Sequence, residues 1–324
     1  MAGAFDIVMN SRRELVEKIL DMMKAGYVFT APEWNRQALR SYNPISAITY
    51  KGGNRLRLMA AAIELGYRDP RWMTARQMAL AGYEKRPGEK GILCEKWIFE
   101  RKIKQLNEDG IEETVIKELN PPRVSFFVVY NAEQVMNFPS LDFQAVHDEE
   151  TMQITERLIQ TSECPIIEVA QTDAYYDYEG DRIVLPPREF FKDEVSFVKT
   201  SIHEIAHSTG HETRLNRDMR HPFGSEQYAR EELRAEIGAL FVEADLGIRL
   251  EAEHYQDHSN YLGSWMKVLK DDPNELFRAC SDAEKINERL MENYRKRYQI
   301  PEPEIERMRI KEMDVPQRKT GRHR

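Results

Sequence analysis

The segment His203-Glu204-Ile205-Ala206-His207 constrains this chain more than any other feature of its sequence. Two histidines four positions apart lie one turn above each other on a helix, where both imidazoles can bind one metal ion. Glu204 follows the first histidine and can reach a metal-bound water rather than the ion itself. Because Zn²⁺ lowers the pKa of its bound water toward ~7, a nearby carboxylate can accept the proton. The segment therefore predicts His203 and His207 as ligands and Glu204 as the catalytic general base.

The surrounding sequence supports a helix of the zinc-peptidase type. Residues 197–202 supply an apolar face before the motif, and Gly210 ends the helix just after the second histidine. Upstream, residues 183–186 read as a strand, at the place where such enzymes have a sheet edge that can bind an extended peptide.

A third metal ligand must come from elsewhere in the chain. The position six residues after the second histidine is Thr213, and His211 is only a weaker candidate. The following helix offers Glu232 and Glu236, which share a face at a spacing of four. We predict Glu232 as the ligand and Glu236 as the residue that orients a histidine, with the reverse order as the alternative. Glu231 is expected on a solvated acidic face.

A site with two histidines and one carboxylate suits one divalent ion, with Zn²⁺ expected and Mn²⁺ as the alternative. An oxyanion formed during attack on a carbonyl would need a hydrogen-bond donor. Tyr176 and Tyr228, which precede a predicted strand and the glutamate helix, are the candidate donors.

The length of 324 residues predicts two domains, and 41% hydrophobic with 31% charged residues predicts a chain with real cores and no membrane partner. The N-terminus lacks the pattern of a signal peptide, so a cytoplasmic location is expected. The three cysteines lie far apart in the sequence and indicate reduced thiols.

The fold class predicted from the pattern of elements is α+β, in two domains. Residues 1–142 form an α+β domain with helices at 11–24, 54–65 and 75–80, strands at 91–99 and 124–130, and a hairpin arm or loop at 101–122. Residues 143–300 form a mainly helical domain with a small sheet, in which 166–169 and 181–186 are expected to flank a turn at 179–180. Residues 301–324 are predicted to be a polar, basic and disordered tail.

The first domain combines basic and aromatic residues in the way that single-stranded nucleic acid requires, since cations contact phosphates and aromatic faces stack on bases. The segment from Lys51 to Lys104 is rich in lysine and arginine, although the whole chain carries a net charge of −8. A solvated charged face and buried tryptophans are the simpler alternative. The candidate residues for single-stranded DNA are Tyr50, Lys51, Asn54, Arg55, Trp72, Gln77, Lys85, Lys90 and Trp97.

Taken together, these segments resemble ArdC-type antirestriction proteins. The similar segments are residues 50–54, 69–77, 86–91, 127–134, 181–186, 203–211, 214–215 and 231–239, within a span from about residue 8 to 300. The resemblance implies an N-terminal domain that binds single-stranded DNA and a C-terminal zincin-like metallopeptidase domain. Such proteins are carried by conjugative plasmids, integrative elements and phages and are thought to shield incoming DNA from restriction. Gly53 departs from the family pattern, in which a larger residue is common.

The sequence therefore predicts a mobile-element protein that binds single-stranded DNA and acts on a protein, such as a restriction or defence component. Proteolysis itself is not implied by the motif alone. Two alternatives stay open. One is a protein that coats single-stranded DNA and has a purely structural metal site, and the other is a cytosolic metallopeptidase whose first domain binds protein.

Overall fold

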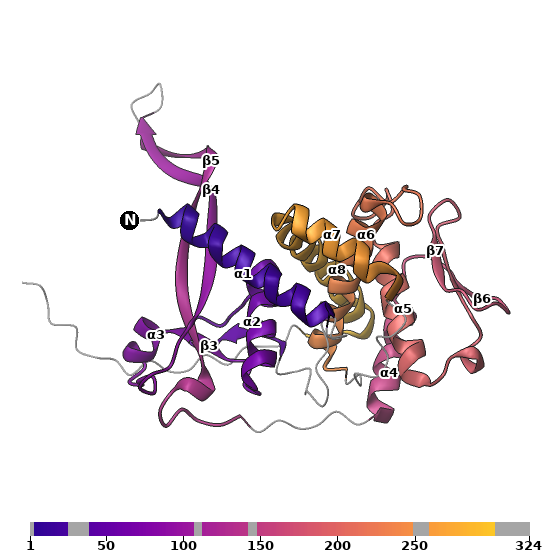
Figure 1. Cartoon of the computed structure of the whole chain (residues 1–324), viewed down its shortest axis with the longest axis horizontal. Helices are drawn as coiled ribbons and strands as arrows, with labels where there is room; N and C mark the ends of the chain where they lie inside the picture. The colour runs from indigo at the N-terminus through magenta and orange to yellow at the C-terminus, as the bar shows by residue number, and fades with distance from the viewer. Residues whose placement is uncertain (1–2, 25–38, 107–111, 142–147, 249–258, 302–324) are drawn as a thin grey trace, which may run out of the picture.

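The structure, a computed structural model, describes residues 3–24, 39–106, 112–141, 148–248 and 259–301 (Figure 1). The predicted domain boundary at 142–143 and the predicted tail from residue 302 lie outside these ranges. Among the helices described, none is both long and apolar enough to cross a lipid bilayer.

The first unit is built on an antiparallel sheet of order β3-β5-β4, in which the two long strands form a hairpin arm. The segment 101–122, expected to be a hairpin arm or loop, is largely strand. The elements are α1 (Ala4–Lys24), β1 (Tyr42–Asn43), β2 (Ile48–Thr49), α2 (Gly52–Leu65), β3 (Trp72–Thr74), α3 (Ala75–Leu80), β4 (Ile92–Leu106), β5 (Glu112–Asn131) and a 3₁₀ turn (Ala132–Gln134).

The ends of two helices in this unit follow from local chemistry. Thr74 forms a capping box with Gln77 at the start of α3. Helix α2 ends at Gly66, whose φ of 77° lies in the left-handed region that glycine adopts without a Cβ clash. Both boundaries were predictable because the signals lie within a few residues of the helix end.

The second unit places helices beside a small three-stranded sheet. Its elements are α4 (Asp148–Ile159), β6 (Ile166–Glu168), β7 (Tyr175–Asp177), β8 (Arg182–Leu185), a 3₁₀ turn (Arg188–Phe190), α5 (Glu194–Ser208), α6 (Glu226–Leu246), α7 (Ser259–Asp271) and α8 (Asn274–Tyr298). The expectation that β6 and β8 flank the turn at 179–180 is wrong. That turn joins β7 to β8, and β6 pairs with β8 in parallel.

The two units share a hydrophobic core. Side chains of α1 and α2 pack with those of α6, α7 and α8 in one buried cluster, which includes Leu56, Phe241 and Trp265. Helix α2 lies so close to α8 that a Cβ on Gly53 would come within 2.4 Å of the Phe277 ring. This contact explains the glycine that departs from the family pattern. A second cluster joins α5, β8, α6 and α8 behind the metal motif.

Candidate metal centre

Helix α5 carries the histidine motif and is fixed on two sides. Asp193 caps its first turn by accepting a hydrogen bond from the Ser196 backbone N–H at 2.8 Å. Ile202 and Ile205 are fully buried in the cluster with β8 and α6. The histidine face of α5 is therefore held toward α6, which supplies the carboxylates.

Three side chains converge as a set that could hold a cation: His203, His207 and Glu232. The two Nε2 atoms lie 3.1 Å apart, and they lie 3.4 Å and 3.3 Å from the two Glu232 carboxylate oxygens. Ligands bound tetrahedrally at about 2.0–2.1 Å from a zinc ion stand roughly 3.3 Å from one another. The spacing of the three donors therefore fits one divalent ion, and the donor types suit Zn²⁺ or Mn²⁺.

The charges around these donors also favour a bound cation. Burial lowers the pKa of His207, but Glu232 and Glu231 outweigh it and raise that pKa to about 9. Burial raises the pKa of Glu232, yet the two histidines hold it well below its ordinary value. The carboxylates thus stabilise positive charge among the imidazoles, which a bound metal ion would supply without protonating its ligands.

Each histidine has a second carboxylate on its other ring nitrogen. Glu236 lies 3.3 Å from His203 Nδ1, and Glu231 lies 3.2 Å from His207 Nδ1. The expectation that Glu231 lies on a solvated face is wrong, because it is buried and bound by Arg217 at 2.7 Å. Such outer carboxylates fix the orientation of ligating histidines. Sequence reading missed Glu231 and Arg217 since neither stands at a motif spacing from His207.

Glu204 lies beside the histidines in a buried position. Burial raises its pKa, opposed by His203, His207 and a hydrogen bond from the backbone of Tyr176 in β7. A carboxylate beside the metal donors suits transfer of a proton from a metal-bound water. Because Glu204 contacts β7, it also lies beside the three-stranded sheet.

Tyr176 does not offer a free hydroxyl to this site. Its O–H donates to Asp181 at 2.7 Å, and its oxygen accepts from Arg214 at 2.9 Å. Arg214 also pairs with Asp181 and donates to the Ser208 carbonyl at 2.7 Å. These contacts make Tyr176 part of a clamp that holds the end of α5, so its predicted role as an oxyanion donor is not supported.

The remaining candidates near the motif lie outside the donor set. The Tyr228 ring packs against Phe223 at 5.3 Å, and its backbone N–H is capped by Ser225. His211 lies 2.8 Å from Thr213 and is not among the three converging donors.

Several residues predicted to contact DNA are instead used inside the protein. Trp72 is fully buried and cannot stack on a base, so that prediction is wrong for this structure. The same holds for Arg55, which is buried and pairs with Asp245 at 2.8 Å. Asn54 exchanges two hydrogen bonds with the Glu95 backbone, and the Gln77 carbonyl accepts from Thr74 and Asn43.

The other predicted DNA residues are more accessible. Lys90 is exposed, and Lys85 lies 5.9 Å from the centre of the Tyr130 ring. Trp97 is half-buried with an edge contact to Phe5. Tyr50 is also half-buried, but its hydroxyl bonds the Trp72 carbonyl at 3.1 Å.

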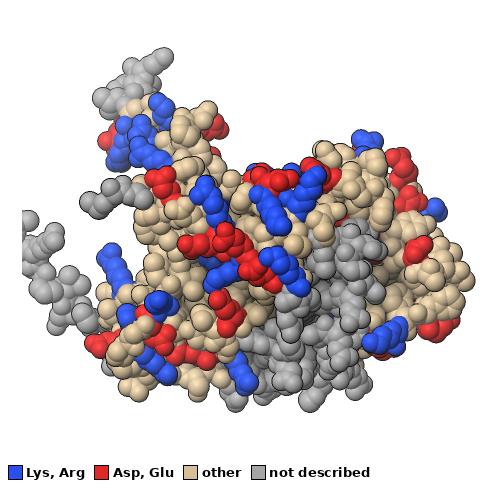
Figure 2. Space-filling model, viewed as in Figure 1, with Lys and Arg blue, Asp and Glu red and all other residues tan. Residues whose placement is uncertain are grey.

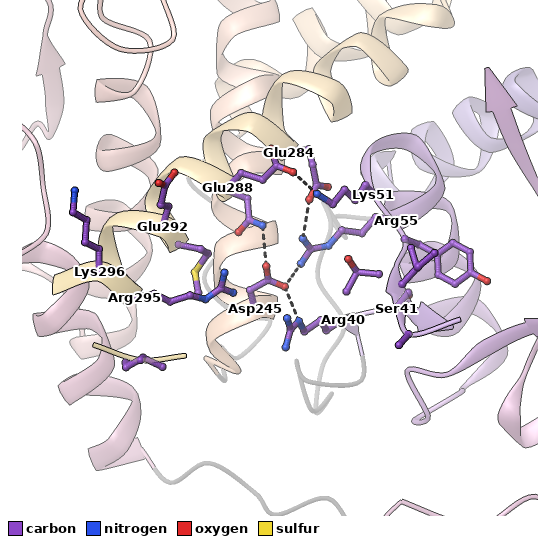
Figure 3. Close-up of a pocket in the computed structure, with 17 residues that line it drawn as sticks. Arg40, Ser41, Lys51, Arg55, Asp245, Glu284, Glu288, Glu292, Arg295 and Lys296 are labelled. Atoms are coloured by element: carbon purple, nitrogen blue, oxygen red, sulfur yellow. Dashed lines mark hydrogen bonds and ion pairs between the residues drawn. The ribbon is translucent and has the colours of Figure 1, made fainter. Parts of the chain in front are cut away.

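A cavity of about 950 Å³ lies where the two units meet, away from the metal donors (Figure 3). Ion pairs cross it from the first unit to the second: Lys51 pairs with Glu288, and Arg55 and Arg40 both pair with Asp245. Part of the basic character of the first unit is thus neutralised by acids of the second.

Comparisons with known proteins cover both units. Residues 9–130 match the family model of the N-terminal domain of the anti-restriction factor ArdC, and residues 153–282 match the family of zincin-like metallopeptidases. The crystal structure of the antirestriction protein ArdC from plasmid R388, in its metal-free form, superposes with a TM-score of 0.66 at 30% identity and covers 88% of this chain and 98% of that one. Its Mn(II)-bound form matches with a TM-score of 0.65 at 29% identity, covering 87% and 97%.

The relatives found by sequence are either longer than this chain or similar to it in length. Two proteins named DNA primase TraC from Escherichia coli are 37% identical over 290 and 292 residues, and the matches cover 86% and 85% of this chain. The chain spans only 19% and 26% of those two proteins. The protein y4eC of Sinorhizobium fredii is 29% identical, and the match covers 84% of this chain and 88% of the relative.

Proposed function

The chain belongs to the family of ArdC-type antirestriction proteins, and we propose that it protects incoming DNA by combining single-stranded-DNA binding with a metal-dependent peptidase-type site. The observation that carries the proposal is the convergence of His203, His207 and Glu232 with Glu204 beside them. The family matches on either side of residue 142 support the pairing of the two activities.

In the second unit His203, His207 and Glu232 would hold the ion, with Zn²⁺ as the first choice. A bound ion of this kind activates water and polarises a carbonyl group. Glu204 accepts the proton of the attacking water and delivers it to the leaving amine. Glu231 and Glu236 keep the two imidazoles in the orientation that points both Nε2 atoms inward. The protein acted upon would be a restriction or defence component close to the DNA.

Replacing Glu204 with Gln tests the catalytic half of the proposal. The side chain keeps its size but loses the base, and removing a general base costs a factor of about 10² or more in rate. We expect E204Q to bind one equivalent of Zn²⁺ and to bind DNA like the wild type. Transfer of a conjugative plasmid into restricting recipients should nevertheless fall to the level seen without the protein, while transfer into non-restricting recipients stays unchanged.

A second candidate function is coating of single-stranded DNA by a protein whose metal is structural. The burial of the donors favours it, since Glu232 is 5% exposed and His207 is 7% exposed. On this reading E204Q would protect DNA as well as the wild type, and only variants that lose the metal, such as H203A, would fail. The same transfer assay therefore separates the two functions.

For the first unit, Lys85, Lys90 and Trp97 are predicted residues that the structure leaves at least partly accessible for DNA, as is Lys51, which also pairs with Glu288. Binding through phosphates releases counterions, so affinity should fall steeply with salt. A first unit that binds protein instead would show no binding of a single-stranded oligonucleotide, or binding that salt does not change.

A further inference from the structure

The hairpin arm of β4 and β5 projects past α1, away from the rest of the described chain (Figure 1). At its lower part α1 lies over one face, where Arg12 pairs with Glu95 and Phe5 contacts the Trp97 ring at 6.5 Å. Beyond that contact the arm continues to Leu106 and Glu112 with paired strands. Its outer part therefore presents surface that the fold does not use.

One face of the arm carries aromatic residues in a row. Side chains two apart on a strand share a face, so Trp97, Phe99 and Arg101 line up along β4. The register irregularity beside Phe99 adds its extra residues to β5, so the alternation along β4 is kept. Phe99 is 62% exposed, so its ring is open to solvent and accessible to a ligand.

Two cations face each other on the same side of the arm. Arg101 is the cross-strand partner of Lys117, so their side chains leave the sheet side by side. Like charges in this position repel, and neither side chain forms an ion pair with any residue in the described part of the chain. An anion from outside the protein would relieve that repulsion. Lys and Arg side chains indeed gather on the outer arm in Figure 2.

The opposite face of the arm differs because its cations lie among acids. Lys104 pairs with Glu112 at 2.5 Å, and Lys102 lies next to the cross-strand pair of Glu100 and Glu118. That face is close to neutral by itself. Glu113 lies on the face of Arg101 and Lys117, where it accepts a hydrogen bond from Gln105 at 2.9 Å, but in the described register only Arg101 and Lys117 are two cations directly opposite each other.

We propose that the arm face formed by Phe5, Trp97, Phe99, Arg101 and Lys117 binds single-stranded DNA. Arg101 and Lys117 contact adjacent phosphates, and an unstacked base lies on Phe99. Duplex DNA is a poorer ligand because its bases are stacked on each other and cannot reach the ring. This inference rests on the proposed single-strand binding and locates it on a surface of which the sequence reading marked only Trp97.

The test is fluorescence anisotropy of a labelled 20-mer deoxyoligonucleotide across a salt series, with unlabelled duplex as competitor. The arm-face variant R101E/K117E should bind at least about ten-fold more weakly, and its salt slope should be shallower by about 1.4, since each single-strand phosphate contact contributes roughly 0.7. F99A should lose roughly five-fold or more in affinity with an unchanged salt slope, because stacking releases no counterions.

The matched control is K102E/K104E, which makes the same change in charge on the opposite face. It should bind within about three-fold of the wild type, and circular dichroism should show all variants folded. Equal weakening by the two double variants, or wild-type affinity in R101E/K117E, would overturn the arm assignment while leaving single-strand binding intact. A wild-type protein that binds no oligonucleotide at low salt would instead remove the proposed function and this inference together.

Discussion

At the scale of single residues, the carboxylates behind the histidines matter as much as the metal donors. Glu231 lies 3.2 Å from His207 Nδ1 and is itself fixed by Arg217, which also donates to the Thr209 hydroxyl at 2.7 Å. Burial raises the pKa of Glu231, but Arg217 and His207 hold it below its ordinary value, so it is charged. A charged, fixed acceptor keeps the His207 ring turned with Nε2 toward the ion.

We expect Glu231→Gln to weaken Zn²⁺ binding by about 10- to 100-fold, the usual effect of losing such a partner. Competition with a chromophoric chelator measures this directly. Glu236→Gln should act in the same direction through His203. The exposed Glu212 provides a control, since Glu212→Gln leaves both histidines untouched. Wild-type affinity in folded E231Q would show that Glu231 has no orienting role.

The sequence left the third ligand open between Glu232 and Glu236, but the two histidines were predictable at this scale because a spacing of four on a helix fixes geometry before any fold is known. Glu231 was not, since its role depends on α6 being buried on nearly all sides. The same limit applies to Arg55 and Trp72, which a sequence cannot separate from exposed cations and aromatic residues. Local chemistry is readable from a sequence, whereas burial is decided by which distant elements pack together.

At the scale of elements, Gln77 is a residue that could serve either as a DNA contact or as part of a helix cap. The sequence suggested a DNA contact, but its side chain caps α3 and also accepts from Asn43 at 3.0 Å. We expect Gln77→Ala to lower the free energy of unfolding by about 1 kcal/mol, as lost caps do, and to leave DNA affinity unchanged. Urea denaturation and the anisotropy assay measure the two effects.

The matched variant for this prediction is Thr74→Ala, which removes the other half of the same capping box. Both variants should lose similar stability. If Q77A alone weakened oligonucleotide binding, the side chain would be a DNA contact after all.

The boundaries of α2 and α3 were close to prediction because caps and glycines are local signals, whereas α1 begins at Ala4 and not at the predicted residue 11. The small sheet was not close to prediction, because β7 has only three residues and β6 pairs in parallel with a strand that is not its neighbour in sequence. The position of such short strands depends on the helix against which they pack. Here β7 matters for function, since the Tyr176 backbone reaches Glu204.

At the scale of the whole molecule, the division of charge joins the two units. The basic first unit and the acidic second unit meet across Arg55, Arg40 and Lys51 on one side and Asp245 and Glu288 on the other. The sequence showed this division and suggested an anionic partner for the first unit. Acidic residues of the second unit supply part of that anionic partner, and a count of charges cannot show this.

This junction should make stability depend on pH in the acid range. Burial raises the pKa of Asp245, but Arg55, Arg40 and Asn287 outweigh it and hold that pKa below its ordinary value. A carboxylate with a lowered pKa in the folded state stabilises the fold above its unfolded pKa of about 3.9 and loses this effect as pH falls through the folded value. The urea midpoint should therefore fall as pH drops below about 4.

Asp245→Asn removes that charge at every pH and leaves the buried Arg55 guanidinium with Glu284, 3.8 Å away, as its remaining acidic partner. We expect a loss of roughly 3 kcal/mol at pH 7, because a buried pair is costly to break. Replacing both partners, as R55M/D245N, should recover part of the loss, and the fall in midpoint below pH 4 should be shallower in both variants. A D245N protein as stable as the wild type at pH 7 would mean that the shared hydrophobic core alone joins the two units.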